Sequence, residues 1–596
     1  MPHKASTTSP LAWLALLALA IGVYALGLGG QYIPSNGDEL VYTHIARLTA
    51  ASGHWLPLVS ELDHMRNTKP PLLFWQALVA GDWGQHWSMA ALRTPSLIYT
   101  LLLAGAVAWT VQQITRNWRH ACLAACVYLA FFCTFRFGRT YLTSAPETFW
   151  LNLPLFCLLW QRLRQANSSP AAPVSHLGWL AHLGFGIALG LGLAYKSFAL
   201  IAPAAATLWC AQLLSGPPMN WRSTLHITLK VSVSGALALG IFALWFVLDP
   251  DPAAVWQEFV IGENAGKMNN RQGYWQIALY GGGFSIWAQL LAYVQNAGLL
   301  AFVVLGLMGL GLQRGLAAWR LRRNTNTSLA PHLIILLVWL GVWLLVFTLP
   351  SQRSARYVIP AMPALAILLT LYWDRLARGW FVTSLLLCGL FIGVLGRIAW
   401  AAHEMDIGSN FEFTAAMLGM SLGLLLVLGT LFKPAWTRTG TVAACLAVYA
   451  CFGLTTAALN GASGQYDAAT MVQLRNARVA VPNGFNGQFE RFQFLLPGNQ
   501  FVAYDSDERA SRSTQSIELT QLLTRHDAVI WLQASLAEQA PPCMPQCTVL
   551  GSRWEVKGRH QSGEITLANL WHPQAWLFRR EWLVTQVVPP ASAAAK

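Results

Sequence analysis

The strongest constraint on the fold is a series of long apolar runs. About thirteen runs of about 17 to 25 residues are long enough to cross roughly 30 Å of hydrocarbon as helices. They lie near 11–29, 92–114, 120–137, 146–163, 178–195, 197–214, 225–248, 289–312, 332–349, 357–373, 380–400, 412–432 and 440–460. We therefore predict an α-helical polytopic membrane protein with about thirteen transmembrane helices.

The composition supports a membrane protein. Hydrophobic residues make up 55% of the 596 residues and charged residues only 11%, against about 25% charged in ordinary soluble domains. This excludes a soluble multidomain protein, a disordered chain and a coiled coil. The net charge of +14 would suggest nucleic acid in a soluble protein, but basic cytoplasmic loops explain it here, and we expect no nucleic-acid partner.

The distribution of basic residues predicts the orientation. With a cytoplasmic N-terminus, the inner loops collect fourteen basic residues and a single acid, Asp374. The basic residues are Lys4, Arg116, Arg119, Arg162, Arg164, Arg222, Arg314, Arg320, Arg322, Arg323, Arg375, Arg378, Lys433 and Arg438. The loop after the first run, the segment 249–288 and the C-terminal tail then lie on the outer side. The first run has no cleavage site after a short apolar core, so we predict a retained signal anchor.

The chain divides into two predicted domains. Residues 1–460 form the transmembrane module, and residues 461–596 have the composition of a small soluble α/β domain outside the membrane. Strands are predicted at 501–504, 528–532 and 548–556 around a helix at 517–525. Cys543 and Cys547 are consistent with a local disulfide or with two free thiols in an oxidising compartment, and two further ligands for zinc are not found nearby.

Unusual polar residues lie in the outer loops rather than at the centres of the spans. A transporter would place ionisable residues at mid-membrane on repeated, broken helices, so a transporter is the alternative rather than the main interpretation. The first outer loop carries Asp38-Glu39, with apolar Leu40, Val41, Ile45 and Leu48 at helical spacing. This pattern predicts an amphipathic helix along the membrane surface.

Two roles are open for the charged residues of this loop. Asp38 could cap the helix or act as a general base, and Lys69 could reach lipid headgroups or bind an anionic substrate. Further cations and carboxylates follow in the outer segments 93–96, 139–147, 195–197, 258–267 and 351–360. Nucleotide-driven chemistry is not supported, because the sequence has no P-loop or dinucleotide fingerprint.

The motifs resemble a known family. Asp38-Glu39, Tyr42, Ile45-Ala46-Arg47, the segment Lys69-Pro70-Pro71-Leu72-Leu73-Phe74-Trp75 and Arg93-x-Pro95-Ser96 are similar to the first outer loop of membrane glycosyltransferases of the protein mannosyltransferase and lipid A aminoarabinose transferase superfamily. Arg356-Tyr357-x-x-Pro360 resembles the late motif of that family. The resemblance covers about residues 11–375.

The resemblance implies a GT-C fold and an inverting transfer of sugar from a polyprenyl-phosphate donor, without a cofactor. The catalytic residues it implies are Asp38, Glu39 and Glu147. The donor phosphate would be bound by Lys69, Lys196, Lys267 and Arg356, and the substrates would be positioned by Tyr42, Arg93, Asn264 and Tyr357.

The sequence departs from the family at two positions. Ser144 stands where many relatives have an acid, and Ser144-Ala145-Pro146-Glu147 is either a capping box for the next helix, the interpretation we favour, or the site of a relocated carboxylate. Thr68 stands where aminoarabinose transferases tend to have glutamate, so we predict no required metal.

The resulting functional prediction is a glycosyltransferase of the bacterial inner membrane, with a periplasmic C-terminal domain. Its acceptor is lipid A, another envelope glycan or a protein, and the sugar is open. The alternative is a flippase or transporter of polyprenyl-linked sugars.

Overall fold

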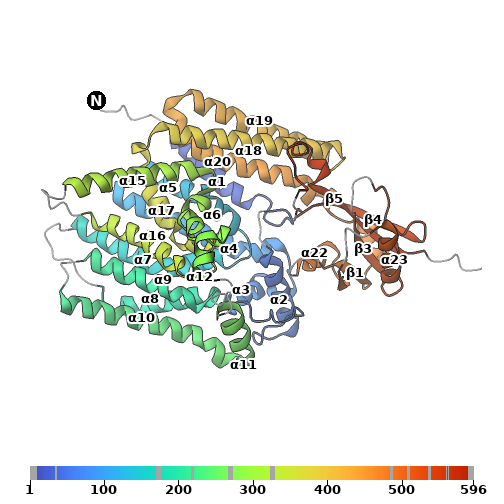
Figure 1. Ribbon diagram of the computed structural model, residues 1–596, viewed down its shortest axis with the longest axis horizontal. Coiled ribbons are helices and arrows are strands. Elements are labelled where there is room, and N and C mark those ends of the chain that lie inside the picture. Colours follow the sequence, from blue (N-terminus) through green and yellow to red (C-terminus); the bar gives the residue numbers. More distant parts are fainter. Residues whose placement is uncertain are drawn as a thin grey trace, which may run out of the picture. The chain divides into compact units, whose positions relative to one another are not determined.

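The computed structural model describes residues 10–33, 37–168, 177–216, 220–265, 273–321, 329–483, 487–505, 511–533, 538–558, 560 and 563–587 (Figure 1). The chain forms two compact units. The first contains Met1–Leu28, Ile45–Gly389 and Leu425–Tyr449, and the second contains Gly29–His44, Leu390–Leu424 and Ala450–Lys596. The segment that begins the first outer loop therefore belongs to the same unit as the C-terminal region.

Each of the predicted apolar runs is helical (Figure 1). The helices are α1 Pro10–Ala25, α4 Met89–Thr115, α5 Trp118–Ala130, α6 Phe132–Phe137, α7 Ser144–Ser168, α8 Trp179–Tyr195, α9 Ile201–Leu214, α10 Trp221–Leu248, α14 Ala292–Ala297, α15 Ala301–Leu321, α16 Pro331–Thr348, α17 Met362–Leu371, α18 Arg378–Glu404, α19 Asn410–Phe432 and α20 Pro434–Asn460. Within the described ranges, eight helical segments are long and apolar enough to cross a membrane, and three shorter helices are also apolar. The predicted polytopic helical fold is confirmed, whereas the number of thirteen spans stays a prediction.

One predicted run is broken, and side chains satisfy the break. Phe131 has an extended backbone between α5 and α6, which frees carbonyl groups that would be costly to leave unpaired in lipid. The hydroxyl of Tyr24 donates to the carbonyl of Leu129 (2.7 Å), and the hydroxyl of Tyr449 donates to the carbonyl of Ala130 (2.8 Å). Two helices far apart in sequence thus stabilise the α5–α6 break.

Shorter helices lie in the loops between the spans. They are α2 Asp38–Ser52, α3 Leu72–Ala80, α11 Pro252–Val255, the π-helix η3 Trp256–Ala265, α12 Tyr274–Tyr280, α13 Ile286–Leu290 and the 3-10 helix η6 Ala355–Ala361. The predicted first-loop helix is confirmed as α2, and its predicted place along the membrane surface stays a prediction. The six consecutive residues from Val41 to Ala46 are all buried, so protein covers more than one face of this helix.

The C-terminal part of the second unit is built on a mixed sheet. Its strands are β1 Arg478–Pro482, β2 Gln500–Tyr504, β3 Ala528–Leu532, β4 Cys547–Val556 and β5 Phe578–Gln586, in the spatial order β2-β1-β3-β5-β4. β1 pairs in parallel with β2 and β3, and β5 pairs antiparallel with β3 and β4. With α21 Ala468–Gln473, α22 Phe492–Leu495 and α23 Arg512–Leu523, this is the predicted small α/β arrangement.

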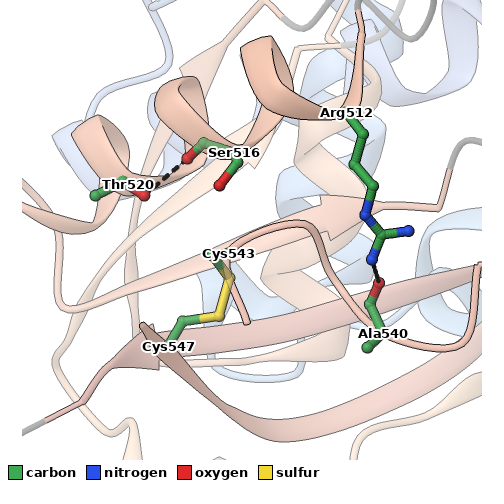
Figure 2. Close-up of a disulfide and its surroundings, with 6 residues drawn as sticks. All are labelled: Arg512, Ser516, Thr520, Ala540, Cys543 and Cys547. Atoms are coloured by element: carbon green, nitrogen blue, oxygen red, sulfur yellow. Dashed lines mark hydrogen bonds between the residues drawn. A yellow bond between two sulfur atoms is a disulfide. The ribbon is translucent and has the colours of Figure 1, made fainter. Parts of the chain in front are cut away.

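Of the two possibilities for the C-terminal cysteines, a local disulfide or two free thiols, the structure has the disulfide. Cys543 and Cys547 are bonded, with their Cα atoms 5.6 Å apart, beside α23 (Figure 2). Arg512 of α23 donates to the carbonyl of Ala540 in the same loop (Figure 2). The disulfide and this hydrogen bond hold the loop that leads into β4.

Candidate active site

A buried ion pair forms the centre of the candidate site in the first unit. Lys196 directly follows α8, and its Nζ donates to Oε1 of Glu147 on α7 at 2.7 Å. Glu147 is fully buried and Lys196 is 16% exposed. Two residues proposed from the sequence for different roles are thus direct partners.

The Glu147 contact corrects the interpretation favoured from the sequence. α7 begins at Ser144, but the Glu147 side chain pairs with Lys196 instead of closing a capping box on the Ser144 backbone. The second oxygen, Oε2, is buried and has no hydrogen-bond partner among the described residues. A carboxylate placed this way is available to a further positive group or to a hydroxyl.

A second ion pair joins Lys69 to the π-helix η3. Nζ of Lys69 donates to Oε1 of Glu263 at 2.6 Å and to the carbonyl of Thr68 at 2.7 Å. The next residue, Asn264, accepts from the hydroxyl of Ser197 at 2.8 Å. Lys69 contacts Glu263, and Asn264 contacts Ser197, the residue after Lys196. Predicted site residues from three distant segments, at 69, 196 and 264, are therefore held close to one another.

The late motif is held by buried hydrogen bonds. The carbonyl of Pro360, in η6, accepts from Nδ2 of Asn152 at 2.6 Å and from Nε1 of Trp339 at 3.2 Å. In the same short helix, the ring of Tyr357 lies 5.9 Å from Nζ of Lys196, and the guanidinium of Arg356 lies 5.0 Å from the ring of Phe137. The motif therefore belongs to the same group of residues.

The electrostatics of this group favour an anion. Burial lowers the pKa of Lys196, the Glu147 carboxylate raises it, and the positive charges of Arg356 and Lys69 lower it further. Lys69 and Arg356 therefore both lie close enough to Lys196 to act on its charge. A bound phosphate would bring negative charge to all three, and charge-assisted hydrogen bonds from lysine and arginine suit phosphate.

Asp38, Glu39 and Tyr42, at the start of the first outer loop, lie in the second unit. α2 begins at Asp38, so Asp38 and Glu39 occupy its first turn, where the helix dipole favours negative charge. Glu39 is 2% exposed and Tyr42 is 4% exposed, whereas Asp38 is partly exposed. Asp38 is therefore the more accessible carboxylate of the pair.

Other predicted residues have different surroundings. Arg93 is buried and donates to the carbonyl of Leu28 at 2.7 Å, so one of its contacts is structural. Lys267 lies outside the described residues. Among the described side chains, no group of three His, Cys, Asp or Glu residues is placed to hold a metal ion, and the absence of a metal requirement stays a prediction.

Sequence reasoning missed two features near Lys69. Glu263 lies in the outer segment 258–267, but the sequence alone does not assign it to the site. Its position next to Asn264, a predicted site residue, points to such a role. In the same unit, a cavity of about 310 Å³ is lined by Glu61, Asp63, His64, Arg66, Asp251 and Glu258, among others. Glu258 also accepts from the backbone N–H of Asn67 at 2.9 Å, which connects the cavity to the loop of Lys69.

The amino-acid sequence is similar to known glycosyltransferases. Residues 35–256 match the family of dolichyl-phosphate-mannose-protein mannosyltransferases. An undecaprenyl phosphate-alpha-4-amino-4-deoxy-L-arabinose arabinosyl transferase of Sodalis glossinidius is 27% identical over 65% of this chain and 66% of its own length, and one of Erwinia tasmaniensis is 28% identical over 64% and 65%. Both matches cover slightly less than two thirds of the relative.

The fold extends the similarity to the whole chain. The crystal structure of ArnT from Cupriavidus metallidurans bound to undecaprenyl phosphate superposes with a TM-score of 0.57, at 17% identity, over 99% of this chain and 100% of that chain. The same protein in the apo state gives a TM-score of 0.54. The family match over part of the chain and the shared fold show a multi-pass membrane protein with the fold of ArnT, which is the GT-C fold.

Proposed function

We propose that the chain is an inverting glycosyltransferase that moves a sugar from a polyprenyl-phosphate donor to a hydroxyl acceptor. The acceptor class is lipid A, another envelope glycan or a protein. The reaction takes place at the outer face of the bacterial inner membrane, with the N-terminus in the cytoplasm and the C-terminal domain in the periplasm. The excess of basic residues in the predicted inner loops supports this orientation.

The observation that carries the proposal is the group formed by Lys69, Lys196 and Arg356. The charges of Lys69 and Arg356 both act on Lys196, and the two lysines are held by the carboxylates of Glu263 and Glu147. When the glycosidic bond to a lipid phosphate breaks, negative charge grows on the leaving phosphate oxygen. Cations placed in advance stabilise that charge without further reorganisation. The relatives' names specify an undecaprenyl phosphate sugar, which is a donor of this chemistry.

The remaining roles follow from the chemistry of the acceptor. Asp38 takes the proton of the acceptor hydroxyl as its oxygen attacks the anomeric carbon, and the polyprenyl phosphate leaves from the opposite face, so the configuration inverts. Glu147 keeps Lys196 oriented and offers its free oxygen to substrate. Glu39 is a further catalytic carboxylate, Lys267 takes part in binding the donor phosphate, and the substrates are positioned by Tyr42, Arg93, Asn264 and Tyr357.

The test uses the purified full-length protein with a polyprenyl-phosphate sugar and membrane acceptors. We expect Asp38→Asn to lower turnover by about 10² to 10⁴, the usual contribution of a general base, with donor binding retained. Asp374→Asn, an exposed carboxylate on a predicted inner loop, is the control. Mass spectrometry of envelope lipids and glycoproteins from cells with and without the gene identifies the acceptor. Near-normal turnover of the Asp38→Asn variant would remove Asp38 from the mechanism, and movement of donor without transfer would favour a flippase.

A further inference from the structure

A network of buried polar residues in the second unit holds the segment that carries Asp38. His44, on α2, is fully buried, and its Nδ1 lies 2.9 Å from Oε2 of Glu490, which is also fully buried. The ring of Phe489 packs edge-on against the His44 ring, with the centroids 5.3 Å apart. Residues 44 and 490 are far apart in sequence, so a C-terminal side chain fixes a residue on the same helix as Asp38, less than two turns further along it.

The other end of the segment is held as well. The backbone N–H of Tyr32 donates to Oδ1 of Asn460 at 3.0 Å. A side chain at residue 30 would place its Cβ 2.4 Å from Nδ2 of Asn460, so Gly30 allows this close approach. Nη1 of Arg553 lies 3.4 Å from the Tyr32 hydroxyl and donates to the carbonyl of Gly464 at 3.1 Å.

Buried ion pairs connect these two anchor points. Arg553 pairs with Glu581 of β5 at 2.5 Å, and Glu581 also pairs with Arg491. Arg491 is the residue after Glu490 in the 3-10 helix η9, Gln488–Arg491. The contacts therefore run from Tyr32 through Arg553, Glu581 and Arg491 to Glu490 and His44. We call these six residues the anchor network.

Burying the charged residues of the anchor network carries a large desolvation cost. Removing charged side chains from water is unfavourable, and a buried ion pair by itself is weak support for stability. Glu490 and Glu581 are fully buried, and Arg553 is 2% exposed. Apolar side chains would hold a sheet together at lower cost, whereas directional contacts fix a segment in one position.

We propose that Glu490 is a positioning residue for the transfer reaction: through His44 it fixes the orientation of the helix that presents Asp38. The proposal rests on the proposed function only for the role of Asp38. Displacement of a catalytic group by about 1 Å costs about a hundredfold in rate, so loss of this contact lowers turnover even though Glu490 itself does not contact substrate.

The test compares three variants of the full chain in lipid nanodiscs. In Glu490→Leu, we expect turnover to fall about tenfold to a hundredfold, with donor affinity unchanged and faster amide hydrogen exchange in residues 38–44. Glu490→Gln keeps an oxygen that accepts from His44 and should retain most of the turnover and the protection. Asp505→Leu, an exposed acid of the same unit, is the control and should change neither.

A double variant keeps the test valid if Glu490→Leu does not fold. His44→Leu combined with Glu490→Leu removes both partners of this contact, and replacement of both partners by apolar groups can be nearly neutral for stability. We expect a melting temperature near that of the wild type, with the same loss of turnover and of protection. Wild-type turnover or unchanged exchange at residues 38–44 in the folded variants would overturn the proposal. Hydrogen exchange does not depend on activity, so failure of the proposed function, seen as an inactive wild type, is a separate result.

Discussion

At the scale of single residues, the most informative side chain is Glu147. Its carboxylate binds Lys196 at 2.7 Å, and the other oxygen lies buried without a partner among the described residues. We therefore expect Glu147→Gln to lower turnover at least about tenfold, because loss of its charge leaves the Lys196 charge uncompensated in a buried place. Ser144→Ala is the matched control, since the hydroxyl of a capping box should matter little here. Full activity of Glu147→Gln would remove Glu147 from the mechanism.

Lys69 allows a separate prediction about the donor. We expect Lys69→Ala to weaken donor affinity, because charge-assisted hydrogen bonds to phosphate are about twice as strong as neutral ones. Lys433→Ala, a lysine on a predicted inner loop, is the control, and donor titration is the measurement. Equal donor dependence in Lys69→Ala and wild type would give Lys69 a structural role, such as its ion pair with Glu263, and remove it from donor binding.

Glu555 gives a prediction about pH. Burial would raise its pKa, but Arg491, Arg579 and Arg553 outweigh burial and hold the pKa below the ordinary value. Folding therefore favours the ionised carboxylate of Glu555. Its contribution to the free energy of unfolding is fully present above about pH 4.3, the ordinary pKa of glutamate, and is lost as the pH falls below that value. We expect Glu555→Gln to lower the free energy of unfolding by about 3 kcal/mol at neutral pH, and the difference from wild type to shrink in acid. A difference that stays constant down to pH 3 would contradict this.

At the scale of elements, the loop closed by the disulfide gives the clearest prediction. Cys543 and Cys547 are bonded (Figure 2), and a short closed loop restricts the unfolded chain by about 2 kcal/mol. We expect Cys543→Ser with Cys547→Ser to lower the unfolding temperature of the C-terminal sheet, with the spans unaffected. Cys157→Ser, which changes an exposed free cysteine, is the control. Equal unfolding temperatures of double variant and wild type would show that the cross-link adds nothing.

Elements differ in how far the sequence predicts them. The spans are predictable, because a chain in lipid must satisfy its backbone within helices, and β2, β3 and β4 follow from short apolar runs. β5 was missed because Arg579, Arg580 and Glu581 interrupt its apolar pattern, and their partners, such as Glu555 for Arg579, lie on another strand.

The pairing of Lys69 with Glu263 spans 194 residues, a separation that local patterns cannot reveal. The site residues themselves came from motif resemblance and stay predictions.

At the scale of the whole molecule, the orientation can be tested directly. Basic residues of the predicted inner loops are expected in the cytoplasm and the C-terminal sheet in the periplasm. We expect a cysteine introduced at Asp505 to react with a membrane-impermeant maleimide in intact spheroplasts, and a cysteine at Arg116 to react only after the membrane is opened. Native cysteines are replaced by serine in both. The reverse pattern would invert the topology.

The anchor network also has a consequence for the time course of synthesis. Tyr32 must wait for Arg553, which is 521 residues further along the chain, and His44 must wait for Glu490, 446 residues further. At about 5 to 20 residues per second, the ribosome needs roughly half a minute to two minutes to supply these partners. The start of α2 therefore reaches its native surroundings only near the end of translation. A chain released early keeps its first spans in the membrane but lacks the contacts that fix the helix carrying Asp38.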